Sequence, residues 1–226
     1  MNSTELKDYF RLQMRDNVAP YLWSDDEVYA YMNDAQRMFC RLSSFVIPDI
    51  TSAITEITIS AGEAYSDISP AIQQIRSAVL QSNNRKLQII SPEDMDKMVS
   101  VDYGYYSAMI DDTTTGPITA MIIGIEPGLV RWAKVPLEDD TVRLSVYRLP
   151  VTPLTTDGQT LEVPEIHHLH LISWMRYLAY QKQDADTYDP KASMAASEVF
   201  HNYCEQTRRE WERARHKHRV VSYGGL

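Results

Sequence analysis

The chain has 226 residues, 44% of them hydrophobic and 23% charged, which is typical of a folded soluble protein with a sizeable core. Its formal net charge of −9 disfavours a general nucleic-acid binder, because such proteins gain most of their affinity by neutralising phosphates. The sequence has no apolar run near the roughly 18 residues that span a membrane, and its polar start lacks the apolar stretch of a secretory signal. We therefore expect a protein that is made and used without export through a signal peptide.

A first helix is predicted at the N-terminal end of the chain. Apolar side chains between Leu6 and Met14 recur three and four positions apart, which is the spacing of one helix face. The helix is expected to end at 17–20, because the residue before Pro20 disfavours the helical backbone conformation.

A second helix is predicted from 24 to about 42, and its start carries a clear capping signal. Ser24 can accept a hydrogen bond from the backbone of Glu27, whose side chain can reach back to Ser24. Trp23 and Val28 flank this cap as the pair of a hydrophobic staple. The carboxylates at 25–27 lie at the positive end of the helix dipole. They point in different directions, so capping explains them better than catalysis does.

Between 47 and 155 the pattern changes to short runs rich in β-branched residues, separated by turn-forming residues. The last run alternates apolar and polar side chains, which predicts a strand with one face in water. A short helix is expected at 91–99, after a serine cap and a proline. The predicted strands are 54–59, 72–80, 86–90, 118–125, 129–135 and 141–148.

Helical spacing returns at 164–183, and a last helix is predicted from Asp189-Pro190 to near 214. Its apolar positions form two stripes, one including Val199 and the other including Phe200 and Cys204. The two cysteines of the chain, Cys40 and Cys204, are too few for a disulfide framework. We expect reduced, buried thiols, unless the two helices that carry them pack side by side.

This order of elements predicts an α+β fold. The N- and C-terminal helix pairs are expected to form a four-helix bundle, with an inserted antiparallel β lobe and an extended C-terminal tail. The predicted boundaries are 1–46 for the N-terminal helix pair, 47–155 for the β-rich lobe, 156–213 for the C-terminal helix pair and 214–226 for a basic arm.

The stretch PEIHHLHLISW at 164–174 raises the question of a metal site. Helix geometry places His168 on the apolar face, while His167 and His170 are neighbours one turn apart and supply only two ligands. A zinc site usually needs three protein ligands, and the HExxH pattern is absent. We expect a partly buried His168, with His167 and His170 solvated or at a contact, and no metal, cofactor or catalytic residue. A metal-dependent hydrolase using His167 and His170 with a remote third ligand stays as an alternative.

Three stretches of the chain carry a further signal: PYLWSDDEVYAYMNDAQRMFCR at 20–41, LSVYRLPVTPL at 144–154 and PEIHHLHLISWMRYLAYQKQDADTYDP at 164–190. Together and in this order they resemble a family of tailed-bacteriophage head-to-tail adaptor (connector) proteins. The resemblance implies a structural virion protein at the neck between capsid and tail, assembled in the host cytoplasm. It implies a ring, commonly of twelve copies, that lies beneath the portal and lines the channel for the genome. The implied partners are the portal protein, further copies of the chain, tail or nozzle proteins, and double-stranded DNA that passes without sequence-specific binding; no membrane is involved.

The resemblance also implies that the C-terminal segment of each subunit docks on the portal. The last part of the chain is basic while the body is acidic, and such asymmetry suits the two different patches that a cyclic ring requires. A basic helix end is also ordinary, since lysine and arginine favour the negative end of the helix dipole. A DNA-binding module using RREWERARHKHR at 208–219 is a further alternative. The residues of the expected portal-docking arm are Arg208, Arg209, Arg213, Arg215, His216, Lys217, His218, Arg219, Val220, Val221, Ser222, Tyr223 and Leu226.

Overall fold

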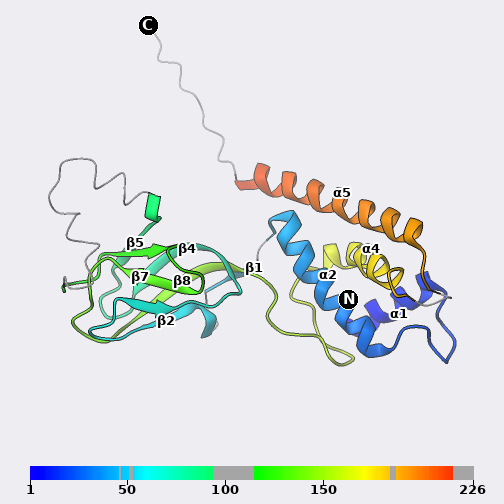
Figure 1. Cartoon of the computed structure of the whole chain (residues 1–226), viewed down its shortest axis with the longest axis horizontal. Coiled ribbons are helices and arrows are strands. Elements are labelled where there is room, and N and C mark those ends of the chain that lie inside the picture. The colour runs from blue at the N-terminus through cyan, green and yellow to red at the C-terminus, as the bar shows by residue number, and fades with distance from the viewer. Residues whose placement is uncertain (46, 51–52, 94–114, 184–186, 216–226) are drawn as a thin grey trace, which may run out of the picture. The chain divides into compact units, whose positions relative to one another are not determined.

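The structure is a computed structural model that describes residues 1–45, 47–50, 53–93, 115–183 and 187–215. The chain divides into two compact units, which are treated separately here. The helical unit comprises Met1–Ile47 and the chain from Leu149 onward, and the β unit comprises Pro48–Arg148 (Figure 1).

The described part of the helical unit contains four α-helices, as the sequence predicts. Helices α2 and α4 are the central elements, because each of them contacts the other three helices (Figure 1). Phe10 of α1, Phe39 of α2, Leu171 of α4 and Phe200 of α5 are fully buried in one shared core. The helices are α1 (Ser3–Met14), α2 (Asp25–Ser43), α4 (His168–Ala179) and α5 (Pro190–Arg215), and a short 3-10 helix, η3 (Glu165–His167), leads into α4.

The predicted cap of α2 is confirmed. Ser24 Oγ accepts a hydrogen bond from the backbone N–H of Glu27, and the Glu27 carboxylate accepts one from the backbone N–H of Ser24. Trp23 and Val28 are both buried in the helical core, where the staple is expected to lie. Such a cap contributes about 1 kcal/mol by satisfying N–H groups that the helix leaves unpaired.

The β unit is a curled sheet around a second core. Its strands lie in the order β1-β8-β4-β5-β6-β7-β3, and β2 pairs with β8. The curl brings β3 beside β2, where Ser66 Oγ donates a 2.8 Å hydrogen bond to the Thr58 carbonyl oxygen. Trp132, Leu144 and Ile59 are nearly fully buried inside. The strands are β1 (Ile47–Asp49), β2 (Glu56–Ile59), β3 (Tyr65–Asp67), β4 (Ile72–Leu80), β5 (Lys86–Ile90), β6 (Ala120–Ile123), β7 (Leu129–Trp132) and β8 (Asp140–Arg148), with a 3-10 turn, η1 (Ala53–Thr55), before β2.

One pairing corrects the prediction of an antiparallel lobe. Strands β5 and β6 run parallel, with Gln88 opposite Ala120 and Ile90 opposite Ile122, so the sheet is mixed. A parallel pair needs a long connection, and 91–119 supplies one, but apolar alternation carries no information on strand direction. Strands β1 and β3 were not predicted, because three residues are too few to show a period. The helix expected at 91–99 lies mostly outside the described residues.

Both cysteines are buried, reduced thiols in the helical core, as expected. Cys40 lies on α2 and Cys204 on α5, and these two helices contact each other. Burial raises the pKa of the Cys204 thiol to about 12, so this side chain stays protonated at neutral pH and behaves as a small apolar group.

Candidate functional site

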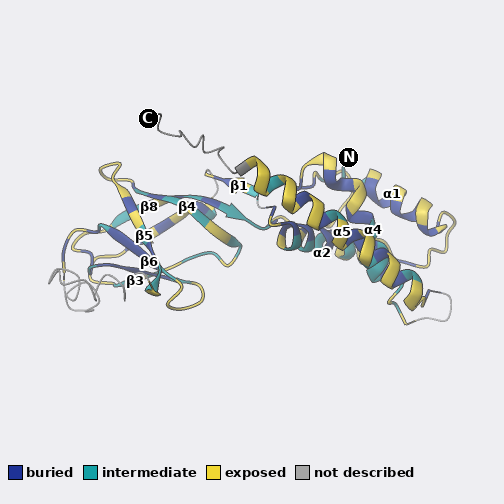
Figure 2. Cartoon of the chain, turned by 90° about the horizontal axis from the view of Figure 1, so that it is seen from above, coloured by how far each residue is buried: buried dark blue, intermediate teal, exposed yellow. Residues whose placement is uncertain are grey.

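Helix α5 carries the described part of the expected docking arm. Asp189 opens it as predicted, since its Oδ1 accepts hydrogen bonds of 3.0 Å from the backbone N–H groups of Lys191 and Ala192. The helix has 26 residues and is therefore about 39 Å long. Its buried side chains lie along one face. Val199, a member of one predicted apolar stripe, is 57% exposed, and only one side of α5 is covered (Figure 2).

The C-terminal turns of α5 present arginines to solvent. Arg209 pairs with Glu205 at 2.6 Å, and Arg208 lies 3.8 Å from Glu212, both one turn apart on the helix. Exposed pairs of this kind stabilise a helix by only a few tenths of a kcal/mol and leave the guanidinium groups accessible to a partner. Arg213 is also exposed. The remaining members of the arm after Arg215, from His216 to Leu226, lie outside the described residues.

Aromatic side chains from three segments fix the same end of α5. The Trp211 ring packs edge-on against the Phe45 ring, with 5.1 Å between the ring centroids. The Phe45 centroid lies 5.7 Å from that of Phe39 of α2. The His167 ring packs against the Phe39 ring with 4.6 Å between their centroids. The Nδ1 atom of His167 lies 2.8 Å from the Tyr203 hydroxyl oxygen. Each aromatic pair contributes about 0.5–1.5 kcal/mol beyond its buried area. The chain that follows Arg215 thus starts from a helix end held by packing.

Two of the three histidines of 164–174, His167 and His170, take part in this packing. His168 is buried, and its Nε2–H donates a 2.7 Å hydrogen bond to the Val163 carbonyl oxygen. His170 is exposed and stacks on the Tyr203 ring with centroids 3.5 Å apart. His167 was expected to be solvated or at a contact, but it is only 9% exposed. The reason is the 3-10 turn η3, whose three residues per turn rotate His167 toward the core compared with a helix that starts at 164.

The residues that the structure describes include no group of three or more His, Cys, Asp or Glu side chains placed to hold a metal ion. His167 and His170 both contact Tyr203 instead. Desolvation by burial lowers the pKa of His167, His168 and His170, so these rings favour the neutral form.

The free energy of unfolding is expected to fall as the pH drops below about 6.5, the ordinary pKa of histidine. The three histidines have lowered pKa values in the folded state, so the unfolded chain takes up protons at higher pH than the folded chain does. Their contribution is complete above about pH 6.5 and is lost as the pH falls through the folded-state values. Urea denaturation between about pH 8 and about pH 5 measures this slope. The variant His167→Phe keeps a ring against Phe39 and should reduce the dependence of the free energy of unfolding on pH. If the free energies of the two proteins ran parallel over this pH range, His167 would not contribute to the dependence.

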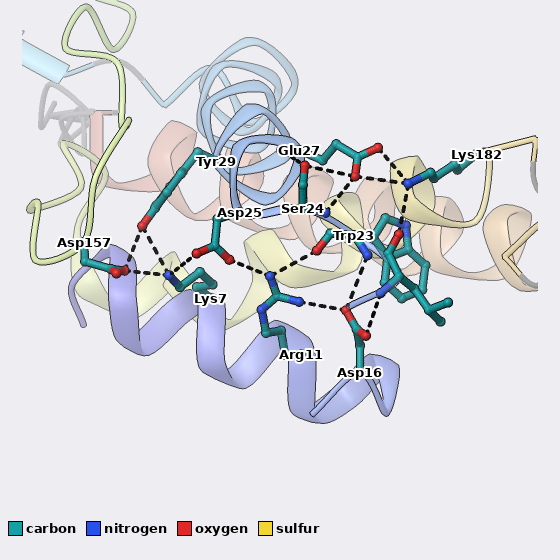
Figure 3. A network of polar contacts seen from close by, with 11 residues as sticks. Lys7, Arg11, Asp16, Trp23, Ser24, Asp25, Glu27, Tyr29, Asp157 and Lys182 are labelled. Carbon is teal, nitrogen blue, oxygen red and sulfur yellow. Dashed lines mark hydrogen bonds and ion pairs between the residues drawn. The ribbon is translucent and has the colours of Figure 1, made fainter. Parts of the chain in front are cut away.

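A partly buried polar network fixes α1 against the start of α2 (Figure 3). Arg11 of α1 is 5% exposed, and its guanidinium contacts Asp16 at 2.7 Å, Asp25 at 2.5 Å and the Trp23 carbonyl oxygen at 3.0 Å. Lys7, one turn earlier, lies 3.1 Å from Asp25. The Arg11 guanidinium lowers the pKa of the Asp25 carboxyl, although burial opposes this. The network therefore favours the charged form of Asp25 while α1 is docked.

The same network reaches two further segments. Lys7 Nζ lies 2.8 Å from Asp157, and the Tyr29 hydroxyl donates a 2.7 Å hydrogen bond to that carboxylate. Burial disfavours the charged form of Lys7, but hydrogen bonds to Asp157, Asp25 and Tyr29 outweigh it and raise the Lys7 pKa. Lys182, beyond α4, lies 2.9 Å from Glu27. Charges from distant parts of the sequence thus converge on the α1–α2 junction.

Helix α2 also binds the segment that returns from the β unit, a role that the sequence reading missed. Asn33 makes a pair of hydrogen bonds with the backbone of Leu154, of 2.9 Å to its carbonyl oxygen and 2.8 Å from its N–H. Gln36 Oε1 accepts a 3.1 Å hydrogen bond from the Glu162 N–H. With Tyr29 these side chains lie at i, i+4 and i+7 on one face of α2. In the sequence, the contact of α2 with this segment is indicated only by these three uncharged polar residues at helical spacing.

No helix within the described ranges has both the length and the apolar character that crossing a bilayer requires. A comparison with curated proteins gave no match. A comparison with family models matched residues 1–219 to the family described as SU10 adaptor protein.

Proposed function

The chain belongs to the SU10 adaptor protein family, a phage head-to-tail adaptor family, and from this premise we propose that it forms a ring beneath the portal. The ring, of about twelve copies by the family resemblance, joins the capsid vertex to tail or nozzle proteins and lines the DNA channel. The observation that carries the proposal is the family match, which extends over nearly the whole chain. The role is structural and uses no catalytic group. The site of action is the neck of the virion.

We assign portal docking to the arm from Arg208 to Leu226. The arm begins on the exposed arginine turns of α5, next to the aromatic packing of Trp211. A helix end held in this way gives the following chain a defined starting point. Residues 216–226, when extended, reach at most about 3.6 Å per residue, or roughly 40 Å, which is long enough to cross onto another protein. A segment that becomes ordered on its partner can cover a large surface despite the entropy cost.

The charge distribution supports both parts of the proposed role. The net charge of −9 coexists with a basic C-terminal stretch, so each copy has an acidic body and a basic extension. Unlike charges steer the encounter of two proteins and fix their orientation. An acidic channel wall would also repel the phosphates of passing DNA, which favours sliding over adhesion.

Removal of 216–226 is expected to abolish attachment to portal-bearing capsids while leaving the subunit folded. The cut falls after the last helical residue, so the thermal unfolding midpoint should stay within a degree or two of the full-length value. Co-sedimentation of adaptor with portal-bearing capsids measures attachment. A matched variant replaces 216–226 by a glycine-serine segment of equal length and should also fail, which separates the sequence of the arm from its mere presence. Full attachment by either variant would exclude the docking role.

A further inference from the structure

The loop that connects β8 to η3 contains a chemically labile pair of residues, Asp157 followed by Gly158. It is the only place in the sequence where an aspartate or asparagine precedes a glycine. In such a pair the glycine amide nitrogen can attack the side-chain Cγ of the preceding residue, because glycine has no side chain to hinder the approach. Both residues are exposed to solvent, so water can reach the pair.

The turn requires both members of the pair. Gly158 has φ 79°, in the left-handed region that favours glycine. A Cβ atom at this position would meet nothing within 4 Å, so the backbone conformation, and not a lack of space, selects glycine. The Asp157 carboxylate lies 2.8 Å from Lys7 Nζ and accepts a 2.7 Å hydrogen bond from the Tyr29 hydroxyl. The labile pair is therefore a consequence of how this loop is built.

Helix α1 engages both of the groups that would react. The Gly158 N–H, whose nitrogen would be the nucleophile, donates a 2.9 Å hydrogen bond to Thr4 Oγ1. The carboxylate that would be attacked faces Lys7 (Figure 3). Hydrogen bonds from Lys7 and then from Tyr29 lower the pKa of the Asp157 carboxyl group. Ring closure expels the carboxyl hydroxyl as water and so needs the protonated acid, which means that a charged Asp157 reacts slowly.

Further hydrogen bonds fasten the first turn of α1 to the same loop. Ser3 is fully buried, and its Oγ donates a 2.9 Å hydrogen bond to the Thr156 carbonyl oxygen and accepts one of 3.0 Å from the Gln159 N–H. The Ser3 N–H donates a 2.8 Å hydrogen bond to the Gln159 carbonyl oxygen. These bonds flank the labile pair on both sides and restrict its backbone. The protection of the pair therefore depends on the docking of α1.

We propose that Asp157 is a site of isoaspartate formation that is closed while α1 is docked and opens when α1 leaves the loop. The Gly158 nitrogen forms a bond to Cγ of Asp157, and the carboxyl hydroxyl leaves with the amide hydrogen as water. The resulting succinimide ring takes up one water molecule at either carbonyl carbon, which gives aspartate or isoaspartate without any oxidant or enzyme. Isoaspartate lengthens the main chain by one methylene group, so the contacts of this carboxylate with Lys7 and Tyr29 are lost.

Local opening sets the expected rate. A folded protein exposes a protected segment only in the fraction of molecules that have opened there. The rate of isoaspartate formation in the folded chain should equal this fraction multiplied by the rate in the unfolded chain. Substitutions that weaken the docking of α1 should therefore raise the rate in proportion to the undocked population, even when they touch neither Asp157 nor Gly158.

Peptide mapping of full-length protein aged in mildly acidic buffer tests the proposal. Isoaspartate at position 157 is recognised by its shifted elution at unchanged mass and by its reaction with an isoaspartyl methyltransferase, and the chain unfolded in urea supplies the reference rate. Thr4→Val removes the acceptor of the Gly158 N–H and should raise the rate about fivefold, the factor that one typical net hydrogen bond corresponds to. Thr155→Val is the matched control. It makes the same change at an exposed position of the loop whose backbone N–H binds Gln159, so the rate should stay unchanged.

Arg11→Met provides a second variant, because it weakens the docking of α1 from a contact with Asp16 and Asp25, away from the labile pair. It should also raise the rate of isoaspartate formation at a temperature where circular dichroism shows the chain to be folded. An increase with Thr4→Val but none with Arg11→Met would overturn the control by α1 docking. The site itself is excluded if the unfolded chain forms no isoaspartate at 157. Equal rates in the folded wild-type chain and the unfolded chain would exclude the protection.

Discussion

Replacement of Arg11 by methionine is expected to lower the free energy of unfolding by about 3–5 kcal/mol. Methionine fills much of the same space but leaves Asp16, which is 4% exposed, as a buried carboxylate without its cation. It also removes the contacts of Arg11 with Asp25 and with the Trp23 carbonyl oxygen. The cost comes from the charge that stays behind, since an unpaired buried charge loses its hydration without compensation. Urea denaturation of the full-length chain measures the effect.

The double variant Arg11→Met with Asp16→Asn is the matched control. Asparagine keeps Oδ1 as an acceptor for the Leu22 N–H and carries no charge, so most of the loss should be recovered. A coupling energy near zero between the two substitutions would show that the pair contributes little. The expectation would be refuted if Arg11→Met alone cost less than about 1 kcal/mol.

Truncation of Phe39 to alanine is expected to cost about 3–5 kcal/mol, as large-to-small changes of buried aromatic residues do. Phe39 is fully buried, and its ring lies against Phe45, His167 and Tyr203, so it joins α2 to η3 and to α5. The cavity would also admit water to His167 and weaken the desolvation that lowers its pKa. Chemical denaturation at neutral pH and at about pH 5 measures both effects.

Val199→Ala provides the comparison for Phe39→Ala. It removes apolar atoms from an exposed position of α5, and such surface changes stay within about 0.5 kcal/mol. Attachment to portal-bearing capsids gives the functional comparison, because the end of α5 that starts the arm depends on the packing around Phe39. Full attachment by Phe39→Ala at a temperature where α5 has lost its packing would show that the arm works without a fixed base.

The parts of this protein that its sequence alone determined are those with local causes. The cap of Ser24 and Glu27, the start of α5 at Asp189-Pro190, and the bounds of β4 and β5 all follow from residues a few positions apart. Capping, proline geometry and hydrophobic period act within one turn of a helix or along one strand, so they can be recognised without knowledge of the fold. The family resemblance also came from the order of such segments.

Other features depend on segments far apart in the sequence, and only the tertiary structure decided them. The parallel pairing of β5 with β6, the burial of His167, and the hydrogen bonds of Asn33 to Leu154 each need a partner that local spacing does not specify. Lys7 and Arg11 read as ordinary polar positions of a helix until Asp25 and Asp157 are brought to them. The physical reason is that burial and charge pairing are set by which surfaces meet. A one-dimensional pattern records which face of an element is apolar but not what covers it.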